Sequence, residues 1–425
     1  MIRQYQQIVW LILFALVNSI TFAAVDMPQV VMPSSKAFTA NDVAVIINDS
    51  DPLSVKIGRY YQRKRNIADE NIIHINFEPN KDTMHPGKFA VLKSIVEART
   101  PEHVQAYVLT WAAPYKVGCM SISSAFAFGY DVKYCAKGCK PTFSSRYYNS
   151  TTHKPYDHFA VRPTMLLAAD NYDDAKALID RGLAADGSLR KGRAYLLETS
   201  DRNRSVRKVF FPSINNQLSN QVDINILKTD TIQNRNNIMF YFTGLKWVDA
   251  IDSNQYLPGA IADHLTSTGG KLTGGNQMSA MKWLQAGATG SYGTVVEPCN
   301  LTTKFPNPLI VMNRYLHGES LIEAYWKSVK MPGQGVFIGD PLAKPYAGFR
   351  LQKYKEGLLL SSPQLKPGFY VIKTADTLDG PFELLTSGIE ISAYKKTIEL
   401  SKPFAAVYSI EPLLNIGEPI ELIIK

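Results

Sequence analysis

A strand–turn–helix pattern recurs along residues 237–345 and restricts the chain to few architectures. Three apolar runs, each followed by a polar or glycine-containing turn, lie in NIMFYFTGL, AGATGSYGTVVEPC and GVFIGDPLAKP. Strands of an open parallel sheet end in this way where their carboxyl ends border a ligand crevice. The pattern therefore predicts a parallel sheet with a site along its carboxyl edge.

The same alternation begins near the N-terminus, where strand-like runs and helical spacings follow one another from residue 42 to residue 111. Together these segments predict one α/β domain over residues 41–347, with a doubly wound, mostly parallel sheet. After Gly348, short β-rich runs separated by turns predict a small antiparallel β-sandwich over residues 348–425. Residues 24–40 are a polar, proline-containing lead-in.

Residues 112–163 interrupt this pattern. The segment contains three of the four cysteines, many aromatic residues and little periodicity. A long insertion inside a compact domain is usually functional. It either covers the crevice or forms a disulfide-linked surface excursion.

Residues 1–23 have the layout of a secretory signal peptide. Arg3 is the only charge before an apolar run over residues 8–17, and Thr21 and Ala23 are small residues at the −3 and −1 positions of a cleavage site. The run is shorter than the roughly 20 residues that span a bilayer. We therefore expect an exported protein with no transmembrane segment in the mature chain; an uncleaved anchor is the alternative.

Four cysteines in an exported chain indicate disulfides. The expected pairs are Cys135–Cys139, as a local link, and Cys119–Cys299, as a clamp across the crevice. A second reading takes Cys135 and Cys139 with His153 and His158 as a four-ligand zinc site. A third takes Cys299 as a catalytic thiol.

The net charge of +9 and the pI near 9.1 favour anionic partners. The basic residues are scattered and no nucleic-acid-binding motif accompanies them, so nucleic acid is not expected as a partner. Lipid headgroups and envelope polymers remain as candidate anionic partners. The glycine-rich segments lack the phosphate-loop pattern, and no cofactor is expected.

Four segments resemble a family of uncharacterised exported bacterial proteins. They are NDSDPLSVKIGRYYQRKRNI, GAIADHLTSTGG, AGATGSYGTVVEPC, and GESLIEAYWKSV with the following GVFIGDPLAKP. The family occurs in bacteria with exosortase-type protein-sorting systems and has no established activity. Its second half is more distantly similar to gingipain-type cysteine peptidases, which implies a caspase-like fold.

The chain departs from the peptidase pattern at both catalytic positions. Residues 243–247, where the resemblance implies a histidine, read TGLKW, and residues 262–267, where it implies the nucleophilic cysteine, read ADHLTS. A thiolate nucleophile needs an imidazole that accepts its proton. The gingipain mechanism therefore does not carry over.

The remaining reactive residues cluster around His264. We expect His264 as general base and Ser267 or Thr266 as nucleophile, with Glu297 from a neighbouring strand end orienting the imidazole. Asp263 is a poorer orienter because adjacent residues of a strand point to opposite faces. In the alternative reading, the acid and hydroxyl groups cap a turn.

Two functions follow from this sequence. In the first, the crevice is catalytically silent and binds a peptide, a secreted protein or an envelope polymer. In the second, the protein is an exported hydrolase with a rebuilt site around His264, Glu297 and Ser267. The expected binding residues are Trp111, Gly244, Trp247 and Asp340.

Overall fold

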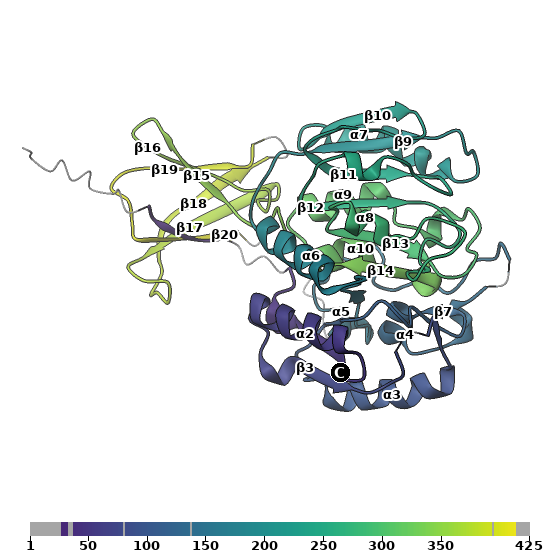
Figure 1. The fold of residues 1–425 in the computed structure, drawn as a ribbon. Coiled ribbons are helices and arrows are strands. Elements are labelled where there is room, and N and C mark those ends of the chain that lie inside the picture. The colour runs from purple at the N-terminus through teal and green to yellow at the C-terminus, as the bar shows by residue number, and fades with distance from the viewer. Residues whose placement is uncertain (1–26, 33–36, 80, 137, 393–394, 414–425) are drawn as a thin grey trace, which may run out of the picture.

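The computed structural model describes residues 27–32, 37–79, 81–136, 138–392 and 395–413. The predicted signal peptide lies outside these residues. The described residues form a large mixed α/β body and a smaller all-β part (Figure 1). None of the helices they form has the length and apolar character needed to cross a bilayer.

The large body contains a ten-stranded sheet with the order β10-β9-β11-β12-β13-β14-β8-β5-β2-β3. All neighbouring strands in it are parallel except β13 and β14, which are antiparallel. The sheet therefore consists of two parallel halves that run in opposite directions. The strands are β2 (Val43–Asn48), β3 (Ile72–Ile75), β5 (Ala106–Leu109), β8 (Thr164–Leu166), β9 (Arg193–Glu198), β10 (Asp223–Lys228), β11 (Ile238–Thr243), β12 (Tyr256–His264), β13 (Gly290–Thr294) and β14 (Gly335–Gly339).

Two consecutive helices explain the reversal. A single crossover helix returns the chain to the edge where the strand began, so the next strand is parallel. Between β13 and β14 the chain instead forms α9 (Pro308–Leu316) and α10 (Leu321–Ser328), which pack against each other. Gly318, with a φ of +90°, lies in the turn between them. The second helix, α10, brings the chain to the edge of the sheet where β13 ends. Strand β14 therefore runs antiparallel to β13.

Helices cover both faces of the sheet. The ring of Phe240 in β11 lies 6.3 Å from Tyr315 of α9, whereas the next residue, Tyr241, lies 4.9 Å from Trp283 of α8 (Met281–Gln285). Adjacent strand residues point to opposite faces, so α8 and α9 lie on opposite sides. The other helices are α2 (Pro52–Arg65), α3 (Pro86–Arg99), α4 (Ile122–Phe128), α5 (Pro155–Phe159), α6 (Tyr172–Ala185) and α7 (Phe211–Leu218).

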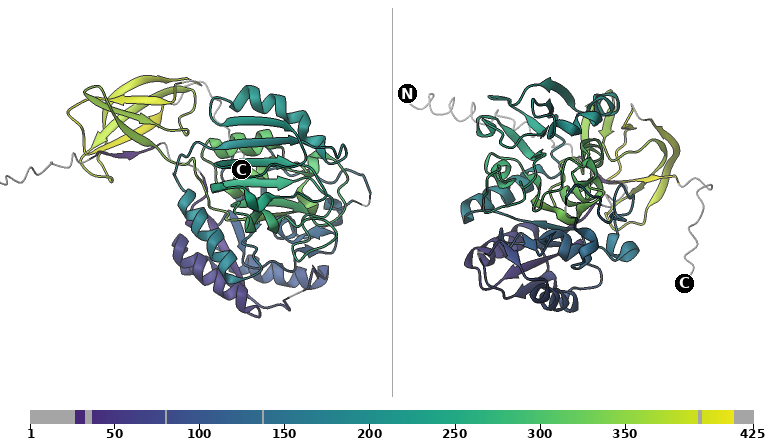
Figure 2. Two further views of the ribbon diagram at one scale, coloured as in Figure 1. Left: turned by 45° about the horizontal axis from the view of Figure 1, so that its top comes forward. Right: turned by 90° about the vertical axis from the view of Figure 1, so that its right-hand side faces the viewer.

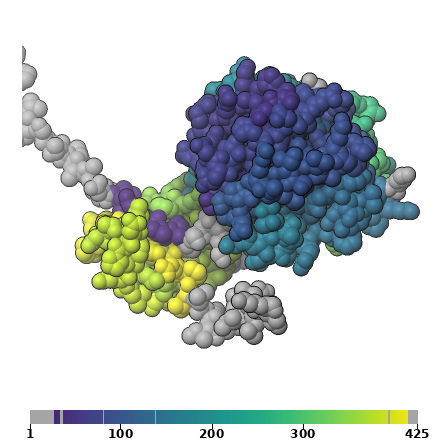
Figure 3. Space-filling view, turned by 90° about the horizontal axis from the view of Figure 1, so that it is seen from below, coloured from purple at the N-terminus to yellow at the C-terminus, as the bar shows by residue number. Residues whose placement is uncertain are grey.

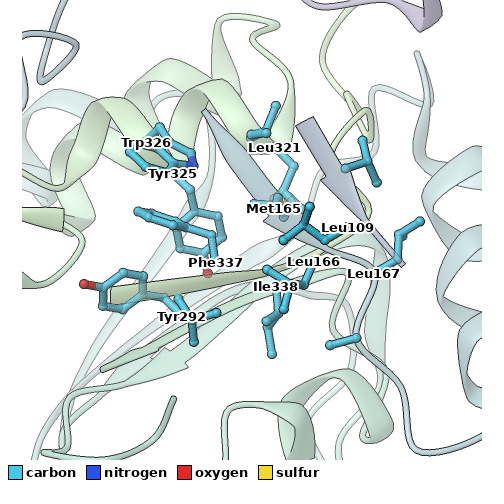
Figure 4. Close-up of a cluster of buried hydrophobic side chains, with 14 of the residues drawn as sticks. Leu109, Met165, Leu166, Leu167, Tyr292, Leu321, Tyr325, Trp326, Phe337 and Ile338 are labelled. Atoms are coloured by element: carbon cyan, nitrogen blue, oxygen red, sulfur yellow. The ribbon is translucent and has the colours of Figure 1, made fainter. Parts of the chain in front are cut away.

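Large side chains fill the seam between the two halves of the sheet (Figure 4). Trp326 of α10 stacks on Phe337 of β14 with ring centroids 4.5 Å apart, and Tyr292 of β13 packs edge-on against the same ring at 5.0 Å. All three side chains are buried. These side chains belong to one hydrophobic cluster that includes residues from both halves of the sheet. Burial of a large apolar side chain contributes roughly 1.5–3 kcal/mol, so this cluster holds the two halves together.

The insertion at residues 112–163 has more regular structure than the sequence indicates. It includes α4, α5 and the short strands β6 (Lys116–Val117) and β7 (Met120–Ser121). Helix α4 packs on β8 and β14, and Phe126 is fully buried among Phe89, Tyr107 and Trp111. Part of the insertion is therefore core.

The C-terminal strands form two sheets with a shared core, beside the large body (Figure 2). One sheet contains β15 (Arg350–Tyr354), β16 (Gly357–Ser361) and β19 (Thr397–Leu400); the other contains β17 (Gly368–Ala375), β18 (Glu383–Ile391), β20 (Val407–Pro412) and β1 (Gln29–Val31). Strand β1 comes from the segment expected only as a lead-in, and it pairs parallel with β20.

Candidate functional site

The strand ends that the sequence assigns to one crevice lie at two opposite edges of the sheet. Gly244, His264 and Glu297 follow or end β11, β12 and β13. Asp340 follows the antiparallel strand β14, and its backbone N–H donates to the Thr289 carbonyl, just before the start of β13, at 3.1 Å. Trp111 follows β5, which runs in the direction of β14. The expectation of one shared crevice is therefore wrong.

His264 is buried and both of its ring nitrogens are hydrogen-bonded. The indole Nε1–H of Trp283 donates to Nδ1 at 2.9 Å. The Nε2 atom therefore carries the proton and donates to the Met278 carbonyl at 3.1 Å. Burial lowers the pKa of His264 to about 3, with a further contribution from the positive charge of Arg207. The imidazole has no free lone pair with which to accept a proton from a hydroxyl.

This burial predicts a specific loss of stability in acid. An unfolded histidine has a pKa near 6.5, so the unfolded chain binds one more proton than the folded chain between about pH 6.5 and 3. The stabilisation is complete above pH 6.5, and we expect it to fall by about 1.4 kcal/mol for each pH unit below. Urea unfolding at pH 4.5–7 should show a shallower pH slope for His264→Asn than for wild type. Equal slopes would contradict a neutral, buried imidazole.

Asp263 lies on the other face of β12, as strand geometry predicts. Its Oδ1 pairs with the Arg207 guanidinium at 2.5 Å, and the Tyr325 hydroxyl donates to Oδ2 at 3.5 Å. Burial raises the pKa of Asp263, and Arg207 opposes this shift. Asp263 is therefore engaged in a buried ion pair beneath α10 and does not orient His264.

Ser267 and Glu297 are not brought to His264. Among the described residues, no hydrogen bond joins the Ser267 hydroxyl to either residue. The exposed Glu297 carboxylate instead accepts from the backbone N–H of Cys299 at 2.7 Å. Thr266 donates to the Gln277 side chain at 2.8 Å. These contacts fit the turn-capping reading better than a catalytic triad.

The predicted binding residues occupy different environments. Trp111 is buried, packs edge-on against Phe77 at 5.0 Å and donates to the Pro114 carbonyl at 3.3 Å. Only a glycine fits at position 244, because a Cβ there would lie 1.9 Å from the Arg204 carbonyl oxygen. Trp247, in contrast, is 52% exposed. Of these three residues, only Trp247 has a side chain that is exposed to solvent.

Asp340 is fully buried in an ion-pair network. It pairs with Arg65, which also pairs with Asp186, and it accepts a hydrogen bond from the Tyr61 hydroxyl at 2.9 Å. Its Oδ1 also caps the backbone N–H of Leu342 at 3.2 Å. The network ties α2 to the end of β14, so Asp340 acts in the fold and is not accessible for binding.

The four cysteines form two disulfides, with pairings that differ from the expected ones. Cys119 is bonded to Cys135, and Cys139 to Cys299. The expected pairs Cys135–Cys139 and Cys119–Cys299 are therefore wrong. Tyr130 lies between the first two cysteines in sequence, and its hydroxyl lies 3.5 Å from the Cys119 sulfur. The folded insertion thus brings Cys135 close to Cys119. Cys139 is then bonded to Cys299.

The zinc and thiol readings are wrong for the same reason. Cys135 and Cys139 belong to different disulfides, so neither offers a thiolate. His153 Nδ1 lies 2.6 Å from the buried Glu323 carboxylate, and His158 Nδ1 lies 2.8 Å from the Thr152 hydroxyl. Cys299, as part of a disulfide, is not a nucleophile.

A groove that the sequence did not predict lies at the carboxyl end of β3. It has a volume of about 610 Å³ and runs between α3 and the segments 76–78 and 81–84. Ligand pockets typically measure 300–1,000 Å³. Its apolar lining consists of Phe77, Met84, Val91, Leu92, Ile95 and Pro114; its polar lining consists of Asn76, Glu78, Lys81, Thr83, His85 and Lys88.

One signal in the sequence points to this groove. Helix α3 buries Phe89, Leu92 and Val96 against the core, as the helical spacing predicts. Val91 and Ile95 are also apolar but lie on a different face, where they are 64% and 40% exposed. Both side chains line the groove, so the helical spacing of these two residues is the feature of the sequence that corresponds to it.

The fold and the site define the class of the protein only coarsely, as a mixed α/β protein with disulfides. No family model matches the chain, and no curated protein matches it. A solved structure described as "Structure of Protease" is similar to it with a TM-score of 0.38 and 10% identity, over 89% of this chain and 96% of that one. A likeness this weak carries no argument about function.

Proposed function

We propose that this is an exported protein that binds a peptide segment without cleaving it. One observation carries the proposal: the only histidine in the predicted catalytic cluster is buried and has hydrogen bonds at both ring nitrogens. A general base must reach the proton that it removes. A catalytic thiol is not supported either, because all four cysteines are in disulfides.

The groove beside α3 is the proposed ligand site. It combines apolar walls with a few polar groups, as most ligand sites do. Viewed from below, the yellow sandwich lies to one side of the purple and blue surface to which α3 belongs (Figure 3). The two disulfides fit an oxidising, exported location.

The hydrolase alternative can be tested directly. We expect the purified protein to show no labelling by a fluorophosphonate or by iodoacetamide under non-reducing conditions, and no cleavage of a mixed peptide pool. The physical reason is that, within the described part of the chain, His264 accepts from the Trp283 indole and from no hydroxyl, and the four cysteines are in disulfides. Labelling and mass spectrometry of the products are the measurements.

The matched variants are Ser267→Ala and Thr268→Ala, which change neighbouring hydroxyls in the same turn. Fluorophosphonate labelling that disappears in Ser267→Ala but persists in Thr268→Ala would overturn the proposal and support the rebuilt hydrolase site.

A further inference from the structure

Two exposed aliphatic side chains form one wall of the groove. Val91 and Ile95 lie one turn apart on α3, and Leu92 lies beside them at the base of the groove. Residues four apart on a helix are separated by a rise of roughly 6 Å. Alternate side chains of an extended peptide, which point to the same side, are roughly 6.6 Å apart. The spacing of this wall therefore matches an extended segment with apolar residues at positions i and i+2.

Polar groups between the apolar ones favour a peptide over an acyl chain. Asn76 and Thr83 offer side-chain amide and hydroxyl groups to the groove. His85 Nδ1 accepts from the Gly87 N–H at 3.1 Å, so Nε2 carries the proton in the neutral ring, and no described residue is seen to accept from it. A peptide backbone offers both donors and acceptors, whereas an acyl chain offers neither.

The charges of the groove are complementary to a carboxylate. Lys81 pairs with Glu78 at 2.6 Å. Lys88, one turn before Val91, has no ion-pair partner among the residues that the structure describes. The Lys81 hydrogen bond lowers the pKa of Glu78, with a smaller contribution from the charge of Lys88. The groove is therefore lined by two lysines, Lys81 and Lys88, and one carboxylate, Glu78, and the excess positive charge lies near the N-terminal end of α3.

From these features we infer that the groove recognises an extended peptide with two aliphatic side chains two residues apart and a carboxylate at the adjoining end. The aliphatic side chains pack against Val91 and Ile95, and the carboxylate pairs with Lys88. This inference rests on the proposed function, since it names the ligand of the same groove.

Fluorescence anisotropy with labelled hexapeptides tests the inference on the full mature chain. The first peptide is Gly-Leu-Ser-Val-Ser-Asp with an amidated C-terminus, so that Leu, Val and Asp point to the same side. Its matched partner, also amidated, carries Asn in place of Asp. We expect the acidic peptide to bind roughly tenfold or more tightly, because a charged hydrogen-bonded contact is lost in the other. A peptide with Leu and Val adjacent should also bind more weakly.

Variants of the groove separate the two contributions. Lys88→Glu should weaken binding of the acidic peptide by roughly tenfold. It should strengthen binding of a peptide that has Lys in place of the acidic residue. Lys56→Glu, an exposed lysine on α2, is the charge-matched control. Ile95→Asn should also weaken binding by roughly tenfold. Ile226→Asn, a similarly exposed isoleucine on β10, should have no effect.

The possible outcomes are distinguishable. Peptides that bind with no sensitivity to Lys88 and Ile95 overturn the inference and leave a peptide-binding function at another surface. If none of the peptides binds, both the inference and the groove as a peptide site fail. If dodecanoate binds with the expected sensitivity to the variants while the peptides do not, the inference is overturned in favour of a lipid ligand.

Discussion

Replacement of Cys139 and Cys299 together by serine is expected to lower the free energy of unfolding by about 5 kcal/mol, because their bond closes a loop with a sequence separation of 160 residues. A cross-link over so long a loop removes much conformational entropy from the unfolded chain. Urea unfolding of wild type and the double variant, both without reductant, measures the difference. Few losses of a single interaction should lower the free energy of unfolding of such a domain by more.

The second disulfide supplies the control. Cys119 and Cys135 are 16 residues apart, and in the same entropic account their double replacement should cost about 3 kcal/mol. An equal or larger loss for this pair would contradict the entropic origin of the difference. Mass spectrometry of non-reduced proteolytic fragments tests the pairing itself, since a fragment that links Cys135 to Cys139 would show it to be wrong.

Asp340→Ala is expected to destabilise the protein by about 3–5 kcal/mol. The substitution leaves Arg65 buried with only the partly exposed Asp186 as a partner, and it leaves the Tyr61 hydroxyl without its acceptor. An uncompensated buried charge has a large desolvation cost. Chemical unfolding monitored by tryptophan fluorescence measures the loss.

Asp180→Ala is the matched control for this prediction. Asp180 also accepts from a tyrosine hydroxyl, Tyr60, and also pairs with a cation, Lys176, but its side chain is 37% exposed. Exposed pairs of this kind contribute at most about 1 kcal/mol. If the two variants lose the same stability, the buried network around Asp340 does not have the role given to it here.

Local rules explain why many elements could be predicted. Asp51 and Pro52 mark the start of α2, and the structure shows the Asp51 carboxylate accepting from the Leu53 N–H at 2.9 Å. Gly318, with a φ of +90°, lies where α9 ends and separates it from α10. In both places the signal lies in a few neighbouring residues.

Strand β12 shows where such rules fail. Its sequence contains Pro258 and Gly259, residues that weaken a strand assignment. The structure accommodates them at an irregularity, where the register between β11 and β12 shifts and Gly259 has a φ of +90°. Long-range pairing overrides the local preference, and no local pattern encodes that pairing.

The site was harder to predict because it depends on strand direction. Alternating strands and helices predict one strand direction throughout the sheet, which would place His264 and Asp340 at the same edge. The paired helices between β13 and β14 reverse the direction, and Gly318 between them is the local feature of the sequence that accompanies this reversal. The environment of His264 depends on Trp283 and Met278, and the sequence alone does not show where their atoms lie.

The change of direction between β13 and β14 has a consequence for how the protein meets other molecules. The loops that follow the strands emerge in two groups at opposite edges of the sheet. The two groups are separated by the length of a strand, roughly 15–20 Å. The α3 groove, at the carboxyl end of β3, and Trp247, after β11, therefore lie at opposite edges of the sheet. A ligand bound in the groove would not compete for space with one that contacted Trp247.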